Sequence, residues 1–199
     1  IYTENGKKCS DILTVVQFLH RFLQNEQAWS SRTIENILKG DSGLKTEGGA
    51  DLFANDFRTL KGSRMTGAGF FADIVRRLFR ADSPAGLEMK SIRNAEGEIG
   101  LRVHGASAYF GLIYVGDASA FRDLVEEHAA EVETGEEVIA GPLFPTVNRA
   151  GSDLQMLIGA KKFIEGWDSW RVSNMCLLNV GRSEGSEIIQ LFGRGVRLK

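Results

Sequence analysis

The stretch FGLIYVGDASAFRDLVEEHAA, residues 110–130, decides the fold. It opens with a nearly continuous apolar run, Phe110 to Val115, which is typical of a strand buried on both faces. Gly116-Asp117 ends the run, and a helix is predicted from Ser119 to about Ala130. Because a buried strand here leads directly into a crossover helix, this stretch predicts an α/β fold.

Two further apolar runs repeat the pattern towards the C-terminus. Leu154 to Ile158 ends at Gly159, and Met175 to Val180 ends at Gly181 before a last helix from about Ser186. Strands that alternate with helices form a mostly parallel sheet with helices on both faces. We therefore expect the three strands to be parallel neighbours, with both glycines at their carboxyl ends.

The residues before this pattern predict helices and one hairpin. The expected elements are a strand at 1–3 followed by a loop at 4–7, helices from Ser10-Asp11 to Leu23, from Ser31 to Lys39 and over 70–79, a short amphipathic piece near 52–60, and a hairpin of 87–93 with 98–103. Gly40 ends the second helix. We interpret about 40–108 as an α+β segment inserted into one α/β domain that spans 1–199.

Composition excludes several classes of protein. The chain has 199 residues, of which 43% are hydrophobic and 25% charged, with three prolines, so it is neither disordered nor fibrous. No stretch is long and apolar enough for a membrane span, and the first ten residues lack an apolar signal core, so we expect a cytoplasmic protein. Its two cysteines predict reduced thiols, with Cys176 as a small core residue, and no structural zinc. Because the chain begins with Ile1, we expect a piece of a longer protein.

Charge is unevenly distributed along the chain. The net charge is −2, yet residues 158–199 hold seven basic and four acidic residues, which leaves −5 on residues 1–157. Anion binding is therefore expected near the C-terminal end. The acidic stretch from Asp123 to Glu137 is interpreted as a solvated helix face and loop.

The predicted last helix carries the first candidate site. Gln190, Gly193, Arg194 and Arg197 fall at i, i+3, i+4 and i+7, so they share one stripe. Two arginines one turn apart beside a glycine suit a phosphate-like anion, because guanidinium forks bind it bidentately and glycine permits close approach. The same pattern is also typical of an exposed helix with two surface arginines.

The second candidate site follows the strand that ends at Gly159. In the segment GAKKFIEGWD, residues 159–168, Asp168 could accept hydrogen bonds from a sugar hydroxyl, Gly166 permits a tight turn, and Lys161 and Lys162 could meet phosphates. The alternative is purely structural, with Asp168 as a turn former beside a core tryptophan.

Together these two segments resemble superfamily 2 helicases. The run FIEGWD, 163–168, resembles the fifth conserved motif of that superfamily, and QLFGRGVR, 190–197, resembles its sixth, Q-x-x-G-R-x-x-R. The sequence KKFIEGWD, followed by QLFGRGVRL, is most similar to the restriction (Res) subunits of type III restriction enzymes. The clear resemblance covers about residues 154–199, with a weaker one over 113–127.

This resemblance implies a second, C-terminal RecA-like domain that closes on ATP held by a first. Arg197, as arginine finger, and Arg194 would meet the γ-phosphate, and Gln190 would help to place the nucleotide or water. Gly166, Asp168 and Gly193 would line the ATP site, with Asp168 on the ribose, while Lys161 and Lys162 would lie near nucleic acid. The family's usual hydroxyl residue is absent at 159–160.

The resemblance also implies which cofactors and partners bind this domain. The cofactors are ATP and Mg²⁺, with Mg²⁺ held by an N-terminal RecA-like domain, because these 199 residues contain neither a G-x-x-x-x-G-K-[ST] loop nor an acidic box. The implied partners are nucleic acid, that N-terminal domain and a modification methyltransferase subunit. DNA is expected rather than RNA. A restriction endonuclease activity could accompany the motor. The alternative is a non-enzymatic nucleic-acid or protein-docking module of the same fold.

Overall fold

The computed structural model describes residues 2–4, 7–159, 169, 171–176 and 178. Its centre is an open five-stranded sheet with the strand order β6-β3-β4-β5-β7. The strands are β3 (Leu87–Ile92), β4 (Glu98–Val103), β5 (Gly111–Tyr114), β6 (Glu133–Glu137) and β7 (Met156–Gly159). β3 pairs parallel with β6, β5 pairs parallel with β7, and β4 is antiparallel to both of its neighbours. Four strands thus run in one direction and β4 alone runs against them, which confirms an α/β fold built on a mixed sheet.

The predicted strands at 110–115 and 154–158 are confirmed as parallel neighbours, with Ile113 opposite Ile158. The predicted strand at 175–180 is not present in its described residues 175, 176 and 178. Met175 and Leu178 are about half exposed, and Cys176 is exposed where a core position was expected. An apolar run becomes a strand only where a neighbour completes its hydrogen bonds, and β5 alone among the described strands pairs with β7.

The predicted hairpin at 87–103 is confirmed, with Leu87 opposite Val103 and Ser91 opposite Ile99. It lies at the middle of the sheet, so the strands that we had assigned to an inserted segment contribute to the central core. The acidic residues 133–137 form edge strand β6, where we expected a solvated helix face and loop. Lys90 and Arg93 of the β3 segment form ion pairs with Glu133 and Glu136, which offsets the repulsion among the carboxylates.

Helices α1 (Asp11–Gln24) and α5 (Ala118–His128) pack on one face of this sheet, and the part of α4 (Gly67–Arg77) around Val75 reaches the same core. Ser10 and Asp117 cap α1 and α5 by accepting hydrogen bonds from Leu13 N and Ala120 N, so α5 begins one residue before the expected start. The buried core joins these helices to alternate strand residues, among them Val16, Leu23, Val75, Leu101, Ile113 and Phe121.

The opposite face carries no helix of the described chain apart from the short 3-10 turn η2 (Phe144–Thr146). The loop 138–155 covers it, and Leu143, Val147 and Leu154 pack on Leu112 there. The last predicted helix, from about Ser186, lies outside the described residues, so the expectation of helices on both faces stays a prediction. Within the described part, this face presents charged residues of β3 and β4, which ion pairs and loop amides satisfy.

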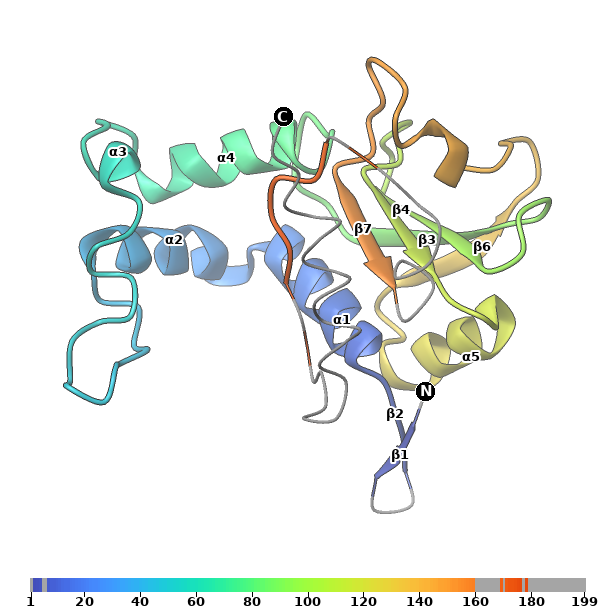
Figure 1. The fold of residues 1–199 in the computed structure, drawn as a ribbon, viewed down its shortest axis with the longest axis horizontal. Helices are drawn as coiled ribbons and strands as arrows, with labels where there is room; N and C mark the ends of the chain where they lie inside the picture. The colour runs from blue at the N-terminus through green and yellow to red at the C-terminus, as the bar shows by residue number, and fades with distance from the viewer. Residues whose placement is uncertain (1, 5–6, 160–168, 170, 177, 179–199) are drawn as a thin grey trace.

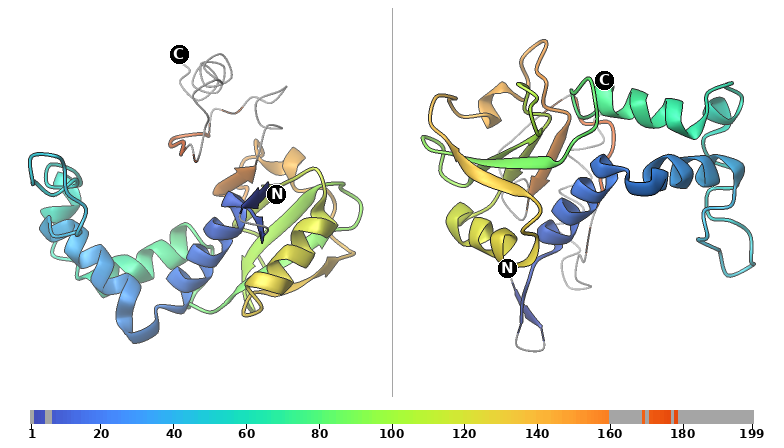
Figure 2. Two further views of the ribbon diagram at one scale, coloured as in Figure 1. Left: turned by 90° about the horizontal axis from the view of Figure 1, so that it is seen from below. Right: turned by 180° about the vertical axis from the view of Figure 1, so that it is seen from behind.

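A helical arm projects from the sheet (Figures 1 and 2). After the turn η1 (Glu26–Ala28), α2 (Trp29–Lys39) runs outward and ends at Gly40, whose φ of 76° suits glycine. The chain returns through α3 (Arg58–Lys61) into α4, which packs along α2. Below α1 in the view of Figure 1, β1 (Tyr2–Glu4) and β2 (Lys7–Cys9) form a separate antiparallel pair, where a strand and a loop were expected. No helix in the described part of the chain is long and apolar enough to cross a membrane.

Candidate functional site

The carboxyl edge of the sheet is where the predicted site begins. Because β3, β5, β6 and β7 run in one direction, they end at the same edge, and Gly159 of β7 lies opposite Tyr114 of β5. Ligands of α/β sheets bind outside the carboxyl ends of strands. The chain thus enters the segment 160–168 from the edge at which the sequence predicts binding.

The predicted site residues themselves lie outside the described part of the chain. These are Lys161, Lys162, Gly166, Asp168, Gln190, Gly193, Arg194 and Arg197. Their grouping into one nucleotide-facing site, including a shared edge for Asp168 and Arg197, stays a prediction.

An open crevice of about 470 Å³ lies at the same edge. The turn after β3 and the loop between β5 and α5 line it, together with Arg93, Arg122 and Glu136. Arg93 donates to both carboxylate oxygens of Glu136, at 3.1 and 2.8 Å, so its fork is already bound. The Asp117 carboxylate caps α5 at 2.9 Å and places negative charge at that helix end, which disfavours a bound anion.

A buried charge network occupies the face opposite the helices. Glu88, only 5% exposed, accepts two hydrogen bonds from Arg102, at 2.6 and 2.9 Å. Lys90 lies 2.7 Å from the same carboxylate. The hydrogen bonds from Arg102, followed by those from Lys90, lower the pKa of Glu88 to about 2. Glu88 therefore stays ionised at neutral pH, so it is a structural anion and not a general acid or base.

Tyr109 extends this network across the sheet face. Its hydroxyl donates to Glu137 at 2.9 Å, and the Arg102 guanidinium lies 5.4 Å from its ring centroid. Gly100 makes room for the ring, since a Cβ there would lie 2.6 Å from two ring carbons. Burial and the hydrogen bond to Glu137 raise the pKa of Tyr109, so its proton is not available for transfer near neutral pH.

Two carboxylates hold the loop that covers this face. Glu98, also 5% exposed, accepts from the amides of Leu143 and Phe144 at 2.6 and 3.2 Å. Glu137 accepts from the amides of Ile139 and Ala140 in addition to Tyr109, and these hydrogen bonds lower its pKa. Loop 138–155 is thus attached to the sheet by carboxylate–amide hydrogen bonds.

Sequence reasoning missed this network, although a signal for it was present. LEMKSI and EIGLRV, residues 87–92 and 98–103, alternate apolar with polar residues, and the hairpin register places Glu88 opposite Arg102. Opposite charges across a strand pair on one face predict an ion pair. We had used the alternation only to predict the hairpin.

The described residues contain no group of three or more His, Cys, Asp or Glu side chains that could hold a metal ion. Comparison with known proteins adds no relative, because no family model, curated protein or solved structure matches this chain.

Proposed function

We propose that this chain is the second RecA-like domain of an ATP-dependent nucleic-acid helicase or translocase of the type III restriction kind. The observation that carries the proposal is the pair of segments FIEGWD at 163–168 and QLFGRGVR at 190–197, in the order and spacing of the fifth and sixth superfamily 2 motifs. An α/β sheet whose strand β7 leads into the first segment from the carboxyl edge supports it.

In this proposal the domain acts on ATP that an N-terminal RecA-like domain holds with Mg²⁺. ATP supplies the phosphoryl group whose transfer drives movement along nucleic acid, and DNA is the expected nucleic acid. Arg197 would bring positive charge to the γ-phosphate, with Arg194 beside it. Asp168 would hold the ribose, Gln190 would orient the nucleotide or water, and Lys161 and Lys162 would bind the nucleic-acid strand. A modification methyltransferase subunit is the proposed protein partner.

The test uses Arg197→Ala in the protein that also carries the ATP-holding domain. We expect nearly unchanged ATP affinity and hydrolysis slower by about a thousandfold or more, because an arginine finger acts in the transition state. Arg197→Lys should fail nearly as badly, since lysine keeps the charge but loses the planar fork. Arg149→Ala, at an exposed arginine in loop 138–155, is the matched control and should keep full hydrolysis.

Hydrolysis rate and nucleic-acid affinity are measured on the same proteins. Near-normal hydrolysis of Arg197→Ala alongside weakened nucleic-acid binding would contradict the motor and favour the docking module of the same fold. Rescue by lysine would show that only long-range charge matters at this position.

A further inference from the structure

The returning half of the arm, residues 57–80, carries a concentration of positive charge that the proposed motor does not use. Residues 57–80 contain six basic residues and one acidic residue, a net charge of +5, whereas the other residues together carry −7, since the chain's net charge is −2. We call the six cations the basic edge: Arg58, Lys61, Arg64, Arg76, Arg77 and Arg80.

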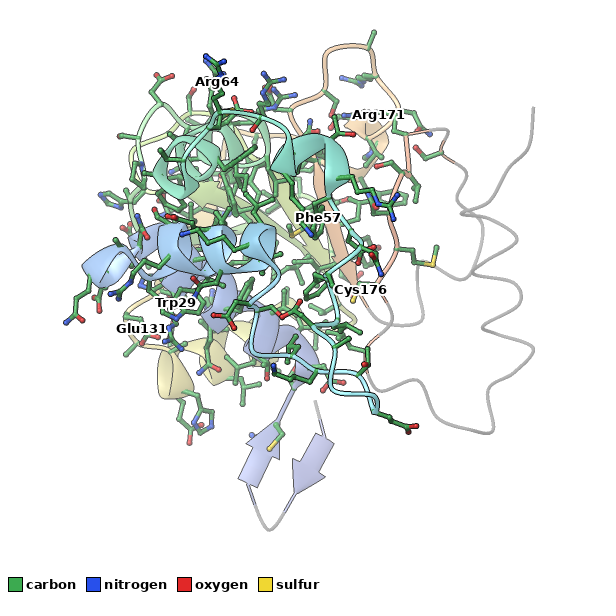
Figure 3. The ribbon with its side chains drawn as sticks, turned by 90° about the vertical axis from the view of Figure 1, so that its left-hand side faces the viewer. Trp29, Phe57, Arg64, Glu131, Arg171 and Cys176 are labelled. Atoms are coloured by element: carbon green, nitrogen blue, oxygen red, sulfur yellow. The ribbon has the colours of Figure 1, made fainter. Side chains whose placement is uncertain are left out.

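One end of the basic edge lies at the tip of the arm. Figure 3 shows Arg64 at the outer margin of the molecule, pointing away from it. Arg58 and Arg64 are exposed, and no described carboxylate forms an ion pair with either. Lys61 donates to the backbone carbonyls of Phe53 and Ala54, at 3.1 and 2.8 Å, so its charge is held in place without being neutralised.

The other end lies on the last turn of α4. Arg76 and Arg77 share the carboxylate of Asp73, at 2.6 and 2.8 Å, so two positive charges are matched by one negative charge. Their side chains are 66% and 73% exposed, whereas that of Asp73 is 28% exposed. Arg80, farther along, lies 3.6 Å from Asp153. The cations therefore face solvent more fully than the one acid of this segment does.

Between the two ends of the basic edge, the exposed side chains of α4 are small. The exposed residues of α4 there are Ala68 and Ala72, with Gly69 half-buried beside them. Small side chains permit another molecule to approach the helix closely. The exposed apolar side chains Phe57, Leu60 and Met65 precede α4 in this segment, so an acidic protein is the competing ligand that the experiment has to exclude.

We propose that the basic edge binds the phosphate backbone of nucleic acid. An 11-residue helix is about 16 Å long, a length along which one strand of a duplex presents about five phosphates. Cations at both ends of such a helix with small residues between them match a repeating polyanion. Because this binding needs neither ATP nor residues 160–199, the inference does not rest on the motor function.

The experiment measures the affinity of the chain for a labelled single-stranded oligonucleotide of about 20 nucleotides, and for the matching duplex, between about 50 and 200 mM salt. In the triple variant Arg64→Gln, Arg76→Gln, Arg77→Gln we expect binding at least about tenfold weaker and a salt slope lower by about 2 to 3. The matched control, Lys8→Gln, Arg93→Gln, Arg149→Gln, removes the same charge outside the arm and should change affinity by less than about threefold.

A variant that raises the net positive charge of this segment, and not one that lowers it, provides a second test. Asp73→Asn removes the one acid of the segment and releases Arg76 and Arg77, so binding should tighten by about threefold and the salt slope should rise by about 1. Thermal unfolding followed by circular dichroism confirms that every variant is folded.

Three outcomes would overturn the proposal. The unsubstituted chain could fail to bind the oligonucleotide at low salt, the triple variant could bind as well as the control, or poly-glutamate could compete as well as DNA at equal charge, which would point to an acidic protein. If Lys161→Gln, Lys162→Gln abolishes binding that the triple variant retains, the basic edge is excluded while the motor proposal stands.

Discussion

At the scale of single residues, Glu88 makes the clearest prediction about pH. Its pKa in the folded chain, about 2, lies below the ordinary 4.5, so its ionised form stabilises the fold fully above pH 4.5. That contribution is lost as the pH falls from 4.5 towards 2, and the shift corresponds to about 3 kcal/mol. We expect Glu88→Gln to lower the free energy of unfolding at pH 7 by about this amount and to flatten its dependence on acid pH, as measured by urea unfolding at pH 7 and pH 3.

Glu136 supplies the matched control on the same sheet. It forms a bidentate pair with Arg93, but their side chains are 43% and 54% exposed, so water screens the interaction. Glu136→Gln should leave the free energy of unfolding nearly unchanged and leave its acid dependence intact. Equal effects of the two substitutions would show that burial of Glu88 contributes nothing.

At the scale of elements, the contact between α2 and α4 depends on Gly67. A Cβ at this position would collide with the backbone oxygen of Ser31 and lie 2.9 Å from the Glu35 Cβ. Backbone cannot move aside as a flexible side chain can, so Gly67→Ala should force the two helices apart and cost about 1–3 kcal/mol. Gly69→Ala is the control, because its nearest neighbours lie at 3.5 and 3.7 Å and alanine favours helix by up to about 1 kcal/mol.

Thermal unfolding of the two variants compares them directly. A Gly67→Ala chain as stable as the Gly69→Ala chain would contradict the close packing of the arm. Hydrogen exchange of α2 and α4 locates the effect, since loosening should be confined to these helices and leave the central strands protected.

Helix ends and the hairpin could be predicted where a single sequence signal was sufficient. Ser10 caps α1 as expected, and alternation over 87–103 predicted the β3–β4 hairpin, whereas Asp117 caps α5 where a helix start at Ser119 was expected. Of the strand order, only the parallel pair of β5 and β7 was predicted, because alternation says which face a residue occupies and not which strand lies next to it. Edge strand β6 was missed for a related reason, since ETGEE reads as solvated unless Lys90 and Arg93 lie beside it.

The candidate site was likewise only partly predictable from the sequence. The positions of Asp168, Arg194 and Arg197 along the chain came from motif spacing, and their arrangement in space stays a prediction because they lie outside the described residues. The network of Glu88, Arg102 and Tyr109 depends on contacts between strands and a loop, of which only the pair across the hairpin could be predicted from sequence.

At the scale of the whole molecule, the carboxyl edge and the basic edge are separate surfaces. The first belongs to the sheet, where the chain leaves β7 towards residue 160, and the second follows α3 and α4 along the arm (Figure 1). Separate surfaces predict separable effects. Substitutions on the arm should alter nucleic-acid affinity without altering nucleotide hydrolysis at saturating nucleic acid.

The last prediction concerns the chain taken alone, which we expect not to hydrolyse ATP. These 199 residues contain no phosphate-binding loop with its lysine and no acidic box for Mg²⁺, and an arginine finger acts only on a nucleotide that other groups hold. Phosphate release should therefore stay at background with or without single-stranded DNA, while addition of the proposed N-terminal RecA-like domain should restore it. Steady hydrolysis by the pure chain that survives Arg197→Ala would show that the catalytic groups lie elsewhere in this sequence, and the motor assignment would then be wrong.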